Sequence, residues 1–236
     1  MGDYKVTKIL DDKGDMRDCV ELIRKKADEV PEKMRSKTNI IGLRLQGNDI
    51  TDLPDWLEKF TKVQELNLSE NKFEKFPAVI GDMEAIKVLK MSHNKLTSLP
   101  KDITYLHRLE ELYLDYNDFE EIPEVIFETN IKELYIRNNK IRCIPAGIAK
   151  MKCLEVLVVD NNQLEEFPEA LAEMPNLREV FIKKNQIERL PRGLLAKMCK
   201  LEVLELDENP LDSPPHEVVM NGIKAMVKYE QEHEND

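Results

Sequence analysis

The sequence predicts an α/β solenoid in which one short coil is repeated, and three observations carry that prediction. Asparagine recurs at intervals of 22 to 24 residues, at Asn48, Asn71, Asn94, Asn117, Asn139, Asn162, Asn185 and Asn209. Apolar residues precede each asparagine at a constant spacing, and an apolar residue followed by proline comes after each of the first seven. A unit of this length cannot bury its apolar residues alone, whereas stacked units share one continuous core, so we expect a single repeat domain.

Each coil has a strand part and a return part. In the coil of Asn117 the leading apolar residues are Leu109, Leu112 and Leu114, and the last two alternate with outward residues as in a strand. Such strands stack into a parallel sheet. The return part begins at the apolar–Pro pairs Leu53–Pro54, Phe76–Pro77, Leu99–Pro100, Ile122–Pro123, Ile144–Pro145, Phe167–Pro168 and Leu190–Pro191. Proline fixes its own φ and disfavours the helical region for the residue before it, so each return part should start extended.

This pattern, Leu-x-x-Leu-x-Leu-x-x-Asn, closely resembles the leucine-rich repeat family. The resemblance implies a curved, right-handed horseshoe with the parallel β-sheet on its concave face and the proline-containing returns on its convex side. It also implies that the asparagine amides form a ladder that satisfies buried backbone groups. The 23-residue period is similar to the intracellular scaffold branch, which includes the Ras-pathway scaffold Sur-8, the repeat domains of Scribble and Erbin and the plant Ras-group repeat proteins.

Three regions are predicted, because a stack of coils leaves an apolar edge at each end that needs a cap. Residues 1–39 form a helical N-terminal cap, with a helix over 15–30. Residues 40–213 form seven full repeats and a truncated one, which start at Ile40, Val63, Ile86, Leu109, Ile131, Leu154, Leu177 and Leu201. Residues 214–236 form a C-terminal capping helix after Pro214–Pro215, followed by a frayed acidic tail from Tyr229. Docking of either amphipathic helix on a partner or a membrane is the alternative to capping.

Composition limits the possible partners and location. The net charge of −11 disfavours binding to nucleic acid or to an anionic membrane. No apolar run is long enough to span a bilayer, and the N-terminus lacks the apolar core of a secretory signal. The four cysteines show no paired spacing, so we expect reduced thiols and a cytoplasmic protein.

The residues with catalytic potential do not form a convincing constellation. The four histidines are scattered, there is no glycine-rich phosphate loop, and no metal or cofactor is expected. Ser92, His93 and Asp115 fall on neighbouring predicted strands. However, consecutive strand residues point to opposite sides, so a hydrogen bond from Ser92 to His93 would be strained. We therefore predict that the protein is not an enzyme.

A column of outward strand positions suggests a binding surface instead. Between the second and third core positions the repeats place Arg44, Asn67, Lys90, Tyr113, Tyr135, Val158, Phe181 and Glu205, so four consecutive repeats present large apolar side chains. The high β-propensity of these residues is the alternative explanation. The next column contains no aromatic residue, which favours a binding site. The predicted site comprises Tyr113, Tyr135, Val158 and Phe181, with Tyr116, Asp115, Arg137, Asp160 and Lys183 around them.

These features predict a monomeric, non-catalytic scaffold or adaptor that binds a protein partner on its concave face. Acidic residues surround the column, so the partner should carry an apolar patch and a basic rim. The family resemblance implies small-GTPase or phosphatase signalling. A constitutive structural subunit of a cytoskeletal or ciliary assembly is the alternative, and an enzyme built on Ser92, His93 and Asp115 is a third hypothesis.

Overall fold

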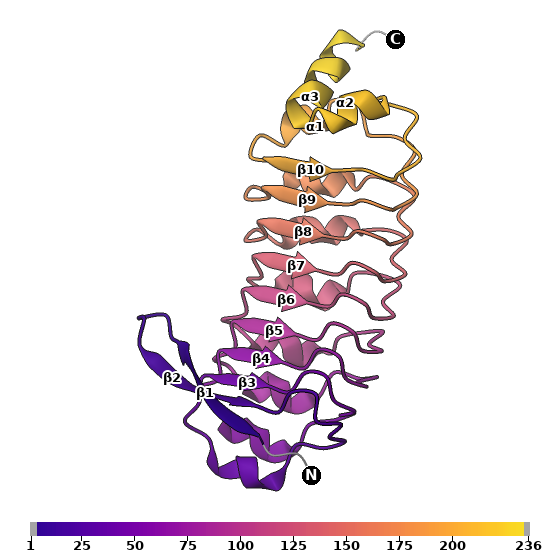
Figure 1. Ribbon diagram of the computed structural model, residues 1–236. Helices are drawn as coiled ribbons and strands as arrows, with labels where there is room; N and C mark the ends of the chain where they lie inside the picture. Colours follow the sequence, from indigo (N-terminus) through magenta and orange to yellow (C-terminus); the bar gives the residue numbers. More distant parts are fainter. Residues whose placement is uncertain (1–3, 234–236) are drawn as a thin grey trace. The chain divides into compact units, whose positions relative to one another are not determined.

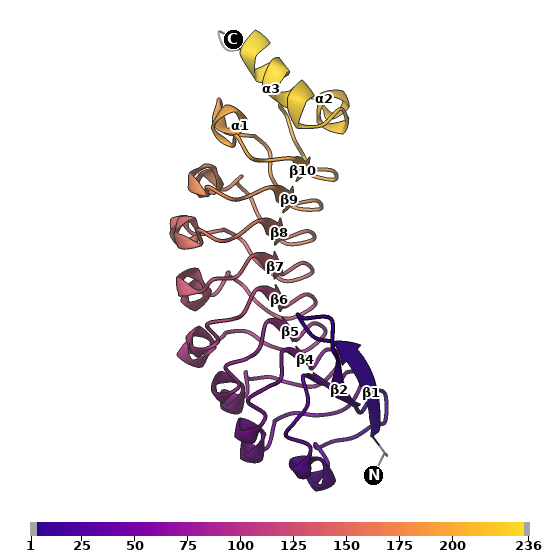
Figure 2. The ribbon, with the colours of Figure 1, turned by 90° about the vertical axis from the view of Figure 1, so that its left-hand side faces the viewer.

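The computed structural model describes residues 4–233. The chain divides into two compact units, with the boundary between Asp118 and Phe119. Both units contain stacked coils with a short strand on one side and a short helix on the other, and the strands from β3 onward have three residues (Figures 1 and 2). The predicted leucine-rich repeat solenoid is therefore confirmed. We call the face formed by the outward side chains of the strands the sheet face.

Within residues 4–118, the first unit contains six strands and four 3₁₀ helices. The strands are β1 (Lys5–Leu10), β2 (Met16–Glu21), β3 (Gly42–Arg44), β4 (Glu65–Asn67), β5 (Val88–Lys90) and β6 (Glu111–Tyr113). β1 pairs antiparallel with β2, and β2 to β6 pair in parallel and in sequence order. The 3₁₀ helices are η1 (Glu32–Ser36), η2 (Asp55–Lys59), η3 (Ala78–Asp82) and η4 (Lys101–Tyr105).

The second unit repeats this arrangement and ends in α-helices. Its strands β7 (Glu133–Tyr135), β8 (Val156–Val158), β9 (Glu179–Phe181) and β10 (Val203–Glu205) are parallel. Its helices are η5 (Glu124–Glu128), η6 (Ala146–Lys150), η7 (Glu169–Glu173), α1 (Leu194–Lys197), α2 (His216–Met220) and α3 (Ile223–Glu232). α3 packs against α1, so the C-terminal segment covers the last coil. No helix within residues 4–233 has the length and apolarity needed to cross a membrane.

The coil of Asn94 shows how the sequence pattern produces the fold. Leu89 and Met91 are fully buried, and Lys90 between them lies on the sheet face. Pro100 is extended at ψ 168° and immediately precedes η4, as predicted from the restricted backbone of the apolar–Pro pair. In this coil the core therefore lies between the strand and the 3₁₀ helix.

The asparagines form the predicted ladder inside the coils. The Asn94 side-chain nitrogen donates to the carbonyls of Leu68 (3.1 Å) and Met91 (3.0 Å), and its oxygen accepts a hydrogen bond from the Phe73 amide (3.0 Å). Leu68 O also accepts from Asn71. Neighbouring asparagines thus share a carbonyl, and turn backbone that would be buried without partners is satisfied.

The predicted helix over 15–30 is wrong. Residues 16–21 form β2, which pairs with β1 on one side and with β3 on the other. The 3.6-residue spacing of apolar residues is coincidental here, because long-range strand pairing overrides a weak local helix signal.

The N-terminal segment is in fact a degenerate coil. Val20 and Leu22 are fully buried and lie 23 residues before Leu43 and Leu45, while Pro31 precedes η1 as later prolines precede their helices. Lys25 stands where later coils have asparagine. Asn48 of the next coil still bonds to the backbone of this N-terminal coil. Its side-chain oxygen accepts hydrogen bonds from the Lys25 (3.0 Å) and Ala27 (3.1 Å) amides.

The single predicted C-terminal helix is broken into α2 and α3. Gly222 separates them with φ 79° and ψ −177°, a conformation that essentially only glycine adopts. The expected fraying from Tyr229 is also wrong for residues up to Glu232, which belong to α3, and Tyr229 stacks on His233 with ring centroids 4.1 Å apart. Residues 234–236 of the predicted tail lie outside the described part of the chain.

The hairpin of β1 and β2 buries Cys19, which gives a prediction on thiol reactivity. Cys143, Cys153 and Cys199 are exposed, whereas burial raises the pKa of the Cys19 thiol to about 11. Because the thiolate is the reactive species, we expect a disulfide reagent at about pH 8 to modify three thiols of the native protein rapidly and Cys19 only on unfolding. Mass mapping of the labelled peptides would check this, and rapid labelling of Cys19 would show that the hairpin does not protect it.

Candidate functional site

The sheet face of the second unit carries a row of apolar side chains from three adjacent strands. The strand register pairs Tyr135 of β7 with Val158 of β8, and Val158 with Phe181 of β9. Adjacent strands lie about 4.8 Å apart, so these side chains are direct neighbours. Leu134, Leu157 and Val180 fill the core from the same strands, so the side chains of the row lie on the sheet face.

Val158 is less accessible than the sequence suggests. It is only 6% exposed, whereas Tyr135 and Phe181 are half-buried. The smaller isopropyl group stands between two large rings in register, so the rings shield it. The expectation that this position presents its side chain to solvent is thus wrong for Val158, and the two aromatic rings form the accessible part of the row.

Carboxylates surround this row. The Tyr135 hydroxyl donates to Glu133 at 2.8 Å, and Lys183 binds both Glu205 (2.6 Å) and Asp207 (3.1 Å). These hydrogen bonds raise the pKa of Lys183, and its ammonium group is paired with carboxylates of the protein itself. The sheet face of the second unit therefore keeps an excess of negative charge.

Asp160 lies beside the row in a partly desolvated position. Burial raises the pKa of its carboxyl group, while the Lys183 backbone amide donates to it at 2.7 Å and acts in the opposite direction. A cationic group from a partner at this position would stabilise the ionised carboxylate. Arg137, on the neighbouring coil, is exposed.

The first unit contributes the other predicted site residues. The Tyr113 hydroxyl donates to Glu111 at 2.9 Å, and Lys90 Nζ lies 4.9 Å from the centre of the Tyr113 ring. Asp115 is buried, whereas Tyr116 is 46% exposed at the rim. Tyr113 is therefore engaged in local contacts on the sheet face of its own unit.

The histidine beside this group makes a stacking contact. The rings of His93 and Tyr116 stack with centroids 4.0 Å apart, and both residues adopt positive φ, at 55° and 54°. The part of the chain that the structure describes shows no hydrogen bond between the Ser92 hydroxyl and His93. Ser92 and His93 thus lack the hydrogen bond that a nucleophile and its base would share. His93 and Tyr116 each come directly before a ladder asparagine, in neighbouring coils. This equivalent position in the repeat is the sequence signal that could have predicted the stack.

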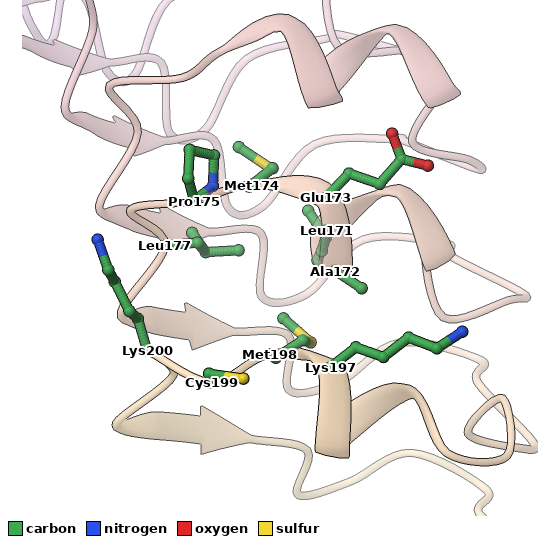
Figure 3. Close-up of a pocket in the computed structure, with 10 residues that line it drawn as sticks. All are labelled: Leu171, Ala172, Glu173, Met174, Pro175, Leu177, Lys197, Met198, Cys199 and Lys200. Carbon is green, nitrogen blue, oxygen red and sulfur yellow. The ribbon is translucent and has the colours of Figure 1, made fainter.

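The second unit also has hollows outside its strands. A pocket of about 330 Å³ between η7 and α1 has an apolar interior of Leu171, Met174 and Met198, with Lys197 and Lys200 at its edge (Figure 3). A larger groove of about 1230 Å³ contains Phe167 and Leu190 with several glutamates. Within residues 4–233 no group of three His, Cys, Asp or Glu side chains could hold a metal ion.

Short parallel strands on stacked coils and an asparagine ladder define a solenoid repeat protein. The chain belongs to the leucine-rich repeat family: the family described as "Leucine-rich repeat region" matches residues 79–220. Domains of this family generally mediate protein–protein interaction and are typically non-catalytic. No curated protein matches the sequence.

Solved structures similar to this chain are themselves leucine-rich repeat proteins. The plant peptide hormone receptor RGFR1 in complex with RGF2 is 26% identical with a TM-score of 0.63, covering 78% of this chain and 31% of the receptor. The leucine-rich repeat domain of APL1B is 23% identical with a TM-score of 0.66, covering 80% and 56%. The ectodomain of the Arabidopsis thaliana receptor kinase GASSHO1/SCHENGEN3 is 20% identical with a TM-score of 0.60, covering 78% and 29%. The chain thus spans about a third of the length of the two plant receptor chains.

Proposed function

We propose that this protein is a non-catalytic scaffold or adaptor that binds a protein partner through the sheet face of its second unit. The observation that carries the proposal is the row of Tyr135, Val158 and Phe181, held in register on three strands and bordered by carboxylates. Aromatic side chains on a rigid surface are the usual anchors of protein interfaces. The excess of negative charge favours a partner whose apolar patch has a basic rim.

Membership of the leucine-rich repeat family supports a role in protein–protein interaction. The similarity to a plant peptide hormone receptor in complex with RGF2 supports a polypeptide ligand. We further propose that the protein acts as a cytoplasmic monomer in small-GTPase or phosphatase signalling. This part of the proposal rests on the similarity of the 23-residue period to the intracellular scaffold branch.

The double variant Tyr135→Ala, Phe181→Ala tests the binding site. Truncating two interface anchors costs about 2 kcal/mol each, so we expect the partner's Kd to rise by about a thousandfold. Affinity purification from cell lysate, read by mass spectrometry, would compare the variant with wild type. Tyr105→Ala is the matched control, because this tyrosine is exposed in η4, outside the sheet face.

Circular dichroism would establish that the double variant is folded. Glu179→Lys offers a second test, since it reverses a charge on the sheet face and removes no buried apolar group. A folded double variant that keeps the full partner set would contradict the proposed site. Partners that co-purify in fixed stoichiometry under all conditions would favour a structural subunit over an adaptor.

A further inference from the structure

The N-terminal hairpin presents an open strand edge, in a different place from the proposed partner site. β1 pairs with β2 only, and among the described residues no strand pairs with its other edge (Figure 1). In an antiparallel strand alternate residues direct their N–H and C=O groups away from the existing partner. β1 therefore offers backbone groups for pairing with a further strand.

Exposed apolar side chains concentrate on one face of this hairpin. Val6 is 50%, Leu10 66% and Met16 57% exposed, and they account for three of the six exposed large apolar side chains among the described residues. The register places Leu10 directly opposite Met16, and Val6 points to the same face four residues before Leu10. A strand added to β1 would cover Val6 and Leu10 with its own apolar side chains.

The charges on β1 define what kind of strand would fit. Lys5 and Lys8 are its only charged residues, and Lys8 lies between Val6 and Leu10 on the same face. Lys8 contacts Asp18 at 2.5 Å with both side chains largely exposed, and such a surface pair contributes little to stability. An incoming carboxylate could therefore compete for the Lys8 ammonium group.

A second copy of the chain is a poor occupant. Antiparallel pairing of two β1 strands that places Val6 opposite Leu10 also places Lys8 opposite the Lys8 of the other copy. Like charges in directly opposed positions destabilise a strand pair. Lysine on an edge strand is a common device against self-association.

We propose that β1 binds an extended segment of a protein partner by β-strand addition, and that the segment carries an acidic residue between two apolar residues on one face. The acidic side chain lies opposite Lys8, and the two apolar side chains cover Val6 and Leu10. Backbone hydrogen bonds between the two strands provide the affinity. The apolar–acidic–apolar pattern of side chains on one face provides the specificity.

A peptide titration of the full chain tests this proposal. The probe is acetyl-Thr-Val-Thr-Glu-Thr-Leu-Thr-amide, and the matched control has lysine in place of glutamate. Amide chemical shifts of the ¹⁵N-labelled protein report both the Kd and the place of binding. We expect shifts at the amides of β1, a glutamate peptide that binds roughly threefold to tenfold tighter than the lysine peptide, and loss of binding when alternate peptide nitrogens are methylated.

The double variant Lys8→Glu, Asp18→Lys provides the second arm. It exchanges the two charges of the hairpin, keeps an oppositely charged pair there and should invert the preference between the two peptides. Equal binding of both peptides, no saturable shift at β1, or a preference unchanged by the exchange would overturn the proposal. Concentration-dependent dimerisation through β1 would also overturn it, because the open edge would then serve a second copy.

Discussion

Asn94→Ala is expected to lower the free energy of unfolding by about 3–5 kcal/mol. The substitution leaves the buried Phe73 amide without its acceptor, at a cost of about 1–3 kcal/mol. It also removes the donor to the Leu68 and Met91 carbonyls, but each keeps one ladder donor, from Asn71 and Asn117. These lost hydrogen bonds add about 1 kcal/mol each.

Urea unfolding followed by circular dichroism would measure this effect. Asn39→Ala is the control, since this asparagine is exposed and its side chain accepts a hydrogen bond from the Lys62 ammonium group (2.7 Å). We expect a change within about 0.5 kcal/mol for the control. Asn94→Asp should also destabilise the protein, because a carboxylate would face two carbonyl oxygens in a buried site. A midpoint for Asn94→Ala equal to wild type would show that the ladder is not required for stability.

Gly42→Glu is expected to displace the N-terminal hairpin and to lower the free energy of unfolding by about 2–3 kcal/mol. A Cβ at Gly42 would lie 2.7 Å from both Cys19 Sγ and Ile9 Cδ1, closer than side-chain atoms normally approach. Glutamate is a natural choice for the test because β4 has Glu65 at the position in register with Gly42. Overpacking of this kind typically costs about 1–3 kcal/mol.

Thiol labelling would report displacement of the hairpin directly, since Cys19 should then react as fast as the three exposed cysteines. Gly42→Ala introduces only the Cβ and should have a smaller effect. The Cys19→Ala, Ile9→Ala double variant lacks both clashing groups, so adding Gly42→Ala to it should be tolerated. The cost of Gly42→Ala in the wild type minus its cost in this double variant measures the steric coupling. A fully protected Cys19 in Gly42→Glu would show that the hairpin can shift without detaching.

Part of the candidate site could be predicted from the sequence, because side-chain direction in a strand alternates from one residue to the next. Counting from Leu134 and Leu157 places Tyr135 and Val158 on the sheet face, and their register follows from the common repeat length. The shielding of Val158 could not be predicted in this way. Exposure depends on the size of the neighbouring side chains on other strands, which the pattern within one repeat does not describe.

The ends of the chain show the same limit. The sequence by itself determined the stacked coils between Ile40 and Asn209, because their spacing, prolines and ladder asparagines are local and repeat many times. Only the tertiary structure decided the N-terminal cap, where Lys25 replaces the ladder asparagine and β2 owes its conformation to pairing with β1 and β3. A strand is stabilised by residues distant in sequence, so a segment with a weak repeat signal takes the structure that its neighbours impose.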